Sequence, residues 1–186
     1  MKRFWLALLA ALLAPAARAD EALWAKLKAG GNLVLMRHAA TEGGAGEPPG
    51  FRLDDCATQR NLSEAGREEA RRVGRQFKFR AINFTTARSS QWCRCLETAR
   101  LAFGAEPESW PLLNSLNAQP DKEFDLIGEV TALAAKVEPP YNAALVTHDF
   151  NIRALTGISP RAAEIVIVRG GSSGLEVVGR IPLPAQ

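Results

Sequence analysis

The chain has 186 residues, with 23 lysines and arginines against 20 aspartates and glutamates, for a formal net charge of +3. Three of the basic residues, Lys2, Arg3 and Arg18, lie within the first 19 residues, so residues 20–186 carry no net charge. This balance excludes the broad basic surface by which proteins bind nucleic acids. The length predicts one domain with a substantial core.

The first 19 residues have the layout of a cleaved secretory signal. Two basic residues precede an apolar run over residues 4–14, and the segment ends in Ala17-Arg18-Ala19. This run is shorter than the roughly 20 residues of a membrane-spanning helix. We therefore expect cleavage after Ala19, a mature domain of residues 20–186, a periplasmic or secreted location, and no stable membrane insertion after cleavage.

Export to an oxidising compartment favours a disulfide among Cys56, Cys93 and Cys95. Cys93 and Cys95 are two residues apart on an expected helix and point in different directions, which makes them poor partners for each other. Cys56–Cys93 is the preferred pair and Cys56–Cys95 the second choice. Without a CxxC pair, zinc binding is not expected.

The first half of the chain predicts a helix, a strand, a long loop and a second helix. The helix covers 21–29 and ends at two glycines, and a buried apolar strand covers 32–36. Residues 39–60 are rich in Gly, Pro and Asp without periodicity, which inside a compact domain is typical of a functional loop. Ser63 is placed to cap the next helix, whose apolar residues recur at helical spacing.

The second half continues the alternation. We predict strands over 84–88, 143–147, 164–169 and 175–181, the last two flanking the turn sequence GGSSG, and helices over 91–103, 121–136 and 150–156. Together the elements predict a three-layer α/β/α sandwich with a mostly parallel central sheet and a C-terminal antiparallel hairpin. Ligands of such sheets bind beyond the carboxyl ends of the strands.

The only two histidines, His38 and His148, each directly follow a predicted buried strand. In a parallel sheet both imidazoles would emerge at the same edge. Arg37 precedes His38, and Arg94 falls in the first turn of its helix, where Ser89 or Ser90 would be the cap and free N–H groups attract anions. With no carboxylate partner enforced by the sequence, two guanidinium and two imidazole groups suit a phosphate dianion.

Three blocks in order resemble the signatures of the histidine phosphatase superfamily, which has the phosphoglycerate-mutase-like fold. Arg37-His38-Ala39-Ala40-Thr41 is similar to the family's Arg-His-Gly-x-Thr motif. The segment SSQWCRCLETA over 89–99 is similar to the family's middle block, and LVTHDFNIRALTG around His148 is similar to the segment around the family's late histidine. The resemblance implies that His38 is the nucleophile that accepts the phosphoryl group. Arg37, Arg94 and His148 would hold the phosphoryl oxygens, without a cofactor or metal.

The proton donor for the leaving group stays open at this point. Asp149 follows His148 as in the phytase and acid-phosphatase branch of the family and is the first choice, whereas Glu42 and Glu123 are alternatives.

The sequence also departs from the family pattern and offers candidates for substrate contacts. Ala39 stands where the signature has glycine, and Arg88 stands where an apolar residue is usual, so Arg88 is either a substrate contact or an exposed charge. Thr41, Glu42, Arg52, Arg60 and Asn61, in or beside the long loop, are the remaining candidates for substrate binding. Arg60 could instead pair with Asp54 or Asp55.

The function expected from these features is an exported phosphomonoesterase that works through a phosphohistidine. Its partner would be a phosphorylated small molecule or an envelope glycan, such as a sugar phosphate of lipopolysaccharide, and not nucleic acid. A phosphoglycerate-type mutase and a phosphate-binding module without turnover are the alternatives. Export counts against the mutase, and the presence of both histidines and both arginines counts against the binding module.

Overall fold

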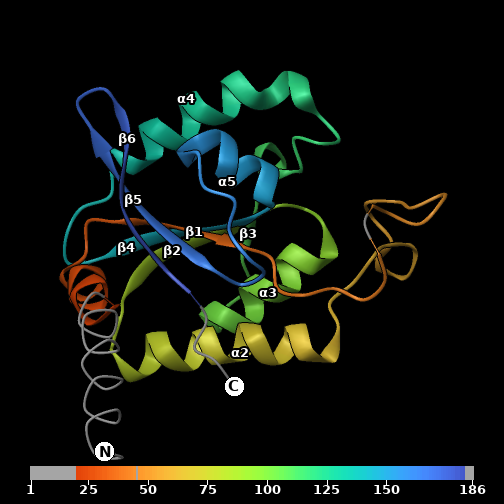
Figure 1. Ribbon diagram of the computed structural model, residues 1–186, viewed down its shortest axis with the longest axis horizontal. Coiled ribbons are helices and arrows are strands. Elements are labelled where there is room, and N and C mark those ends of the chain that lie inside the picture. The colour runs from red at the N-terminus through yellow and green to blue at the C-terminus, as the bar shows by residue number, and fades with distance from the viewer. Residues whose placement is uncertain (1–19, 45, 183–186) are drawn as a thin grey trace, which may run out of the picture.

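The computed structural model describes residues 20–44 and 46–182. The predicted signal, residues 1–19, lies outside this part of the chain. Six strands form one sheet in the order β3-β2-β4-β1-β5-β6 (Figure 1). Their bounds are Leu33–Arg37 (β1), Phe84–Ser89 (β2), Glu108–Ser109 (β3), Asn142–Thr147 (β4), Ile165–Gly171 (β5) and Gly174–Ile181 (β6). Strands β1 to β4 are parallel, and β5 and β6 form an antiparallel hairpin, which confirms the predicted sheet.

Helices cover both faces of the sheet (Figure 1). Helices α2 (Glu64–Phe79) and α3 (Cys93–Phe103) lie on one face, and α4 (Glu123–Ala134) and α5 (Asp149–Thr156) lie on the other. The helix over residues 20–29 packs at one end of the sheet. Short 3-10 turns occur at Cys56–Thr58, Pro111–Leu113 and Pro120–Lys122. Within the described ranges, no helix has the length and apolar character needed to cross a bilayer.

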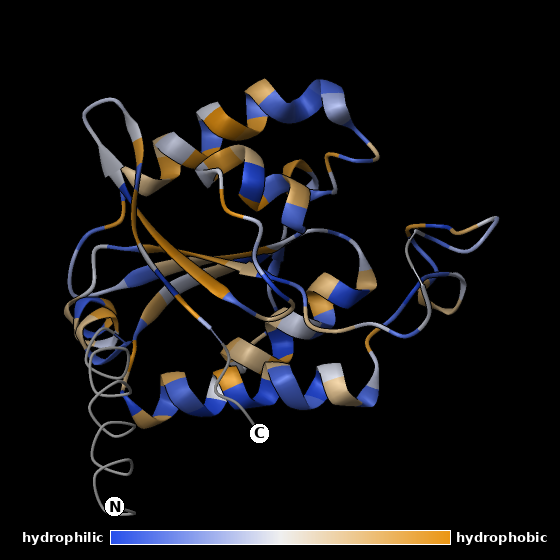
Figure 2. Cartoon of the chain, viewed as in Figure 1, coloured by the Kyte–Doolittle hydropathy of each residue, from blue (hydrophilic) through white to orange (hydrophobic). Residues whose placement is uncertain are grey.

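Strand β1 is buried on both faces, which explains its unbroken apolar sequence. Val34 and Met36 belong to the core under α2 and α3, whereas Leu33 and Leu35 belong to the core under α4 and α5. Figure 2 shows the strands between the layers as the most hydrophobic part of the fold, with polar residues on the outward faces of the helices. The end of β1 is therefore held firmly from both sides.

The loop between β1 and α2 extends away from the rest of the domain (Figure 1). A disulfide joins Cys56 to Cys93, which confirms the preferred pairing, and Cys95 is a buried free thiol.

The start of α3 differs from the prediction. The helix begins at Cys93, two residues later than expected, and neither Ser89 nor Ser90 is its cap, because Trp92 holds that position without a side-chain hydrogen bond. Instead Gln59 Oε1 of the loop accepts the backbone N–H of Cys93 at 3.0 Å. A distant amide therefore satisfies a helix end that a local serine was expected to cap.

Candidate active site

The two histidines lie side by side at the carboxyl edge of the sheet. Strands β1 and β4 pair in parallel with Arg37 opposite Thr147, so the residues that follow, His38 and His148, emerge together. Their ring centroids are 5.4 Å apart, and both side chains are buried. The parallel pairing that the sequence predicted thus brings the two imidazoles into one site.

The hydrogen bond of His38 defines its tautomer. Its Nδ1 lies 2.9 Å from the backbone oxygen of Ala39, which can only accept, so Nδ1 carries the hydrogen and Nε2 keeps the free lone pair. Burial, followed by the nearby charge of Arg94, lowers the pKa of His38 to about 3. The imidazole is therefore neutral at pH 7 and available as a nucleophile.

His148 is held by polar groups of the segment before α3. Its Nε2 lies 3.0 Å from Ser90 Oγ, and the Ser90 hydroxyl donates to Asn114 Oδ1 at 3.0 Å. The Ser90 oxygen therefore accepts the Nε2–H of His148. Burial is the main cause that keeps the pKa of His148 well below its usual value, and a proton on the adjacent His38 would lower it further.

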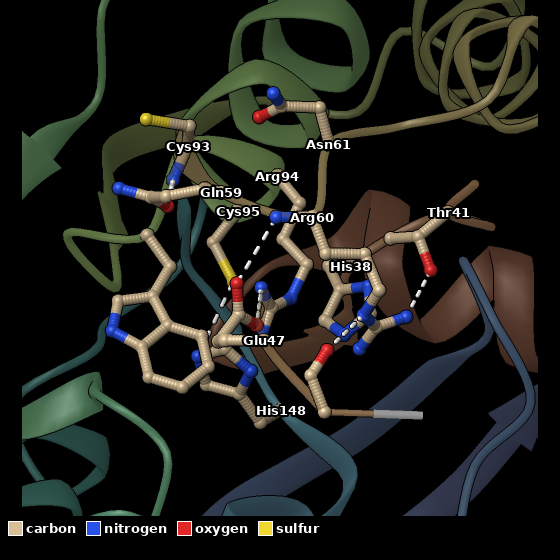
Figure 3. Close-up of polar contacts among 12 residues, drawn as sticks. His38, Thr41, Glu47, Gln59, Arg60, Asn61, Cys93, Arg94, Cys95 and His148 are labelled. Carbon is tan, nitrogen blue, oxygen red and sulfur yellow. Dashed lines mark hydrogen bonds and ion pairs between the residues drawn. The ribbon is translucent and has the colours of Figure 1, made fainter. Parts of the chain in front are cut away.

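Arg94 is buried and has an acidic partner, whereas Arg37 is partly buried. Arg94 is 2% exposed and donates from Nη1 to Glu47 Oε1 at 2.6 Å (Figure 3). Arg37 donates to the backbone oxygen of Pro160 at 2.9 Å. The expectation that the site has no carboxylate partner is wrong for Arg94, because the loop carries Glu47 into it from 47 residues earlier in the chain.

A third arginine, Arg60, joins this group. It donates to the Thr41 hydroxyl and, at 2.8 Å, to the backbone oxygen of Gly46, and its backbone N–H donates to Glu47 Oε2 at 3.0 Å. Partial burial, and then the charge of Arg94, lowers the pKa of Arg60. Arg60 thus binds within the site and not to Asp54 or Asp55, which pair with Arg52.

These groups share one cavity of about 670 Å³. Its lining includes three arginines, both histidines, two carboxylates, and aromatic and small residues: Arg37, His38, Gly44, Gly46, Glu47, Phe51, Arg60, Trp92, Arg94, Ser115, Asn117, Ala118, His148, Asp149 and Phe150. Three guanidinium groups against two carboxylates leave the cavity with an excess of positive charge, which suits an anionic ligand.

Comparison with known protein families agrees with this geometry. Residues 33–120 match the model of the histidine phosphatase superfamily (branch 1), and this segment contains the loop, Arg37, His38 and Arg94. Over these residues the chain belongs to this superfamily. The matched segment ends before β4, so the place of His148 in this histidine phosphatase fold comes from the structure.

Solved structures of several phosphatases share the fold at low identity. A phosphoserine phosphatase variant from Entamoeba histolytica in complex with phosphoserine is 14% identical, with a TM-score of 0.59 over 80% of this chain and 95% of that one. The mycobacterial glucosyl-3-phosphoglycerate phosphatase bound to VO3 is 18% identical, with a TM-score of 0.60 over 80% and 97%. The protein histidine phosphatase SixA bound to tungstate is 15% identical, with a TM-score of 0.55 over 81% and 96%. The comparison with curated proteins found no match.

The three carboxylates that the sequence offered as proton donors lie in different places in this histidine phosphatase domain. Asp149 is half-buried at the start of α5 and lines the cavity with the two histidines. Glu42 is exposed and lines a hollow of the loop that shares Gly44, Gly46, Glu47 and Arg60 with the central cavity. Glu123 is exposed in a neighbouring cavity that shares Asn117 and Phe150 with the central one.

The candidates for substrate binding are likewise divided. Arg60 lines the cavity, and Thr41 contacts it through Arg60. Arg52 is exposed and paired with Asp55 at 2.5 Å, and the side-chain amide of Asn61 donates to the backbone oxygen of Cys56. Arg88 lies near the edge of the sheet, 2.9 Å from Glu108 and against the ring of Trp110. Arg52, Asn61 and Arg88 are thus outside the lining of the cavity.

Sequence reasoning missed three residues of the site, Glu47, Ser90 and Asn114, because no pattern in the sequence links them to the histidines. Ser90 was expected only as a possible cap of the helix that carries Arg94. Glu47 lies in a loop without periodicity, and Asn114 follows the turn Pro111–Leu113, so only the tertiary structure brings them to the site.

Proposed function

We propose that the protein hydrolyses phosphate monoesters through a phosphohistidine on Nε2 of His38. The observation that carries this proposal is a neutral, oriented imidazole beside Arg37, Arg94 and His148 in one cationic cavity. Membership of the superfamily and the phosphatase names of structural neighbours support it. The same groups would bind the equatorial oxygens of the phosphoryl group, where negative charge spreads in the transition state.

The reaction has two displacement steps. Nε2 of His38 attacks phosphorus, the bond between phosphorus and the ester oxygen breaks, and the leaving oxygen takes a proton from Asp149, the carboxyl group nearest in sequence to His148. Water then attacks the phosphohistidine, the phosphorus–nitrogen bond breaks, and the Asp149 carboxylate takes the proton of that water.

His148 contributes through its second ring nitrogen. Because Nε2 is engaged with Ser90, the ring offers a donor to the phosphoryl group only if Nδ1 is protonated. A bound dianion favours the imidazolium and thus opposes the burial that keeps the free ring neutral. Arrival of the phosphoryl group would then be coupled to proton uptake on His148.

The substrate that we propose is a sugar phosphate of the cell envelope, acted on by an exported enzyme. The predicted secretory signal and the Cys56–Cys93 disulfide support an oxidising compartment. Phe51 and Phe150 are 38% and 40% exposed and line the cavity, and a second cavity of about 470 Å³ adjoins it. Such half-exposed rings suit packing against a sugar, and the second cavity would accommodate an extended leaving group.

Turnover of p-nitrophenyl phosphate by the mature protein tests the activity. We expect His38→Ala to abolish it while retaining the unfolding temperature of a folded domain. Asp149→Asn should lose at least about tenfold in kcat on an alkyl phosphate and much less on p-nitrophenyl phosphate, whose leaving group needs no proton. Asp121→Asn, which removes an exposed carboxylate, is the matched control. Binding of phosphate without any turnover would favour the binding module instead.

A further inference from the structure

Glu47 lies where the proposed function places a phosphoryl group. Its carboxylate points at the Arg94 guanidinium, beside the rings of His38 and His148 (Figure 3). One oxygen accepts from Arg94 at 2.6 Å and the other from the backbone N–H of Arg60 at 3.0 Å. The Arg94 and Glu47 side chains are only 3% and 9% exposed, so this ion pair is largely shielded from water.

The ion pair and a phosphoryl group compete for Arg94. The Glu47 carboxylate engages Nη1 of Arg94, and Nε of Arg94 is buried without a hydrogen-bond partner among the described residues. A phosphoryl dianion on the Nε side of the Arg94 guanidinium would bring its charge beside the Glu47 carboxylate, and the two anions would repel each other in the same cavity. Glu47 therefore has to leave Arg94 when a phosphoryl group binds.

The segment that carries Glu47 can move without disturbing the core. Gly43, Gly46 and Gly50 have positive φ angles and open space around them, so their backbone angles can change at low cost. The same segment is fixed at both ends, by the bridge between Thr41 and Leu62 and by the Cys56–Cys93 disulfide. Glu47 therefore stays close to Arg94 at a high effective concentration even after it is displaced.

We propose that Glu47 is a specificity-determining residue, a tethered carboxylate that competes with phosphate for Arg94. The inference rests on the proposed function, because it takes Arg94 as the phosphoryl ligand. Every anion must displace Glu47, which costs binding free energy. Only an ester whose leaving group also contacts the cavity lining, such as Phe51 and Phe150, offsets that cost through additional contacts. Glu47 thus disfavours inorganic phosphate, speeds its release as product and selects for larger phosphoesters.

Calorimetric titration with tungstate and with inorganic phosphate tests this role without turnover. Glu47→Gln keeps the shape of the side chain and removes its charge, and we expect it to bind both anions at least about tenfold more tightly than the wild type. Asp54→Asn removes one negative charge from the same loop at a site 89% exposed, and should change the affinity less than about twofold. Equal or weaker anion binding by Glu47→Gln would overturn the proposal.

Two further measurements separate this inference from the proposed function. Glu47→Ala provides a second variant if Glu47→Gln folds poorly, and should bind tungstate more tightly in the same way. In an active enzyme, Glu47→Gln should lower the inhibition constant of phosphate more than it lowers KM for an ester with a large leaving group. If the wild type turns over no ester but Glu47→Gln still binds tungstate more tightly, the competition stands and the phosphatase proposal fails. A parallel fall in both constants would contradict the selection for larger esters.

Discussion

At the scale of single residues, the site depends on two imidazoles that stay neutral among cations. Burial and the neighbouring guanidinium groups both oppose protonation of His38, so the pKa of this ring falls to about 3. The hydrogen bond from Nδ1 to Ala39 then selects the tautomer with Nε2 free. Arg94 has two effects, since its charge helps to keep His38 unprotonated and, in the proposed function, would also bind the phosphoryl group.

The first prediction concerns the titration of His38 and His148. In the folded protein neither ring should titrate between about pH 8 and pH 5, as followed by the NMR shifts of their ring protons. In the unfolded chain both rings should titrate with a pKa of about 6.5. The unfolded state therefore binds more protons below that pH, and the free energy of unfolding should fall as the pH drops from about 6.5 toward 3, by up to about 1.4 kcal/mol per pH unit for each ring. A ring of the folded protein that titrates near its ordinary pKa would contradict this.

The histidines and two arginines of the site could be predicted from sequence, whereas Glu47 could not. Arg37 ends β1, and His38 and His148 directly follow β1 and β4, so once the strands are known to be parallel, these residues lie at the same edge of the sheet. Arg94 lies in the first turn of α3, a helix that the apolar spacing predicts although its first residue was misplaced. Glu47 reaches Arg94 through a loop whose path depends on the disulfide and on contacts of Arg60, and no local pattern encodes such a path.

At the scale of secondary structure elements, the start of α2 fixes the backbone just after His38. Ser63 caps the helix, as predicted, and also donates to the backbone oxygen of Ala40. Glu69 of α2 accepts the N–H of Ala40, and Thr98 of α3 accepts the N–H of Ala39. Helices from one layer thus hold the turn that orients His38.

The second prediction tests this packing through Gly66, the third residue of α2. A Cβ there would lie 1.9 Å from the backbone oxygen of Ala40. Gly66→Ala should therefore displace the turn after His38, lower the free energy of unfolding by about 1–3 kcal/mol and reduce kcat. Gly128→Ala in α4, where nothing lies within 4 Å, should instead stabilise the protein by about 0.5–1 kcal/mol. Denaturant unfolding measures the free energy of unfolding of each variant, and steady-state kinetics measure its kcat. Equal changes in these two quantities for Gly66→Ala and Gly128→Ala would contradict the role of Gly66.

Element types were more predictable than element boundaries. The apolar runs and helical spacings predicted the main strands and helices, because burial on one or two faces imposes those patterns. The start of α3 was misplaced because Gln59, far away in sequence, supplies the acceptor that a local serine was expected to provide. The two-residue strand Glu108–Ser109 was missed because it is exposed and too short to show alternation.

At the scale of the whole molecule, a small domain builds the site from distant segments. The parallel neighbours β1 and β4 deliver the histidines, and α3 delivers Arg94. The loop over 39–63 adds Glu47 and Arg60 and is fastened by the Cys56–Cys93 disulfide to the residue before Arg94. The loop thus forms one side of the cavity, and Phe51 and Phe150 line it, where the proposed extended substrate would bind.

The most direct test of the central claim is to trap the phosphorylated enzyme. The mature protein is mixed with p-nitrophenyl phosphate, quenched rapidly in alkali, digested and examined by mass spectrometry. We predict a phosphoryl group on His38 that is stable in alkali and lost in acid, and none in His38→Ala. Turnover without this group, or continued turnover by His38→Ala, would contradict the covalent mechanism.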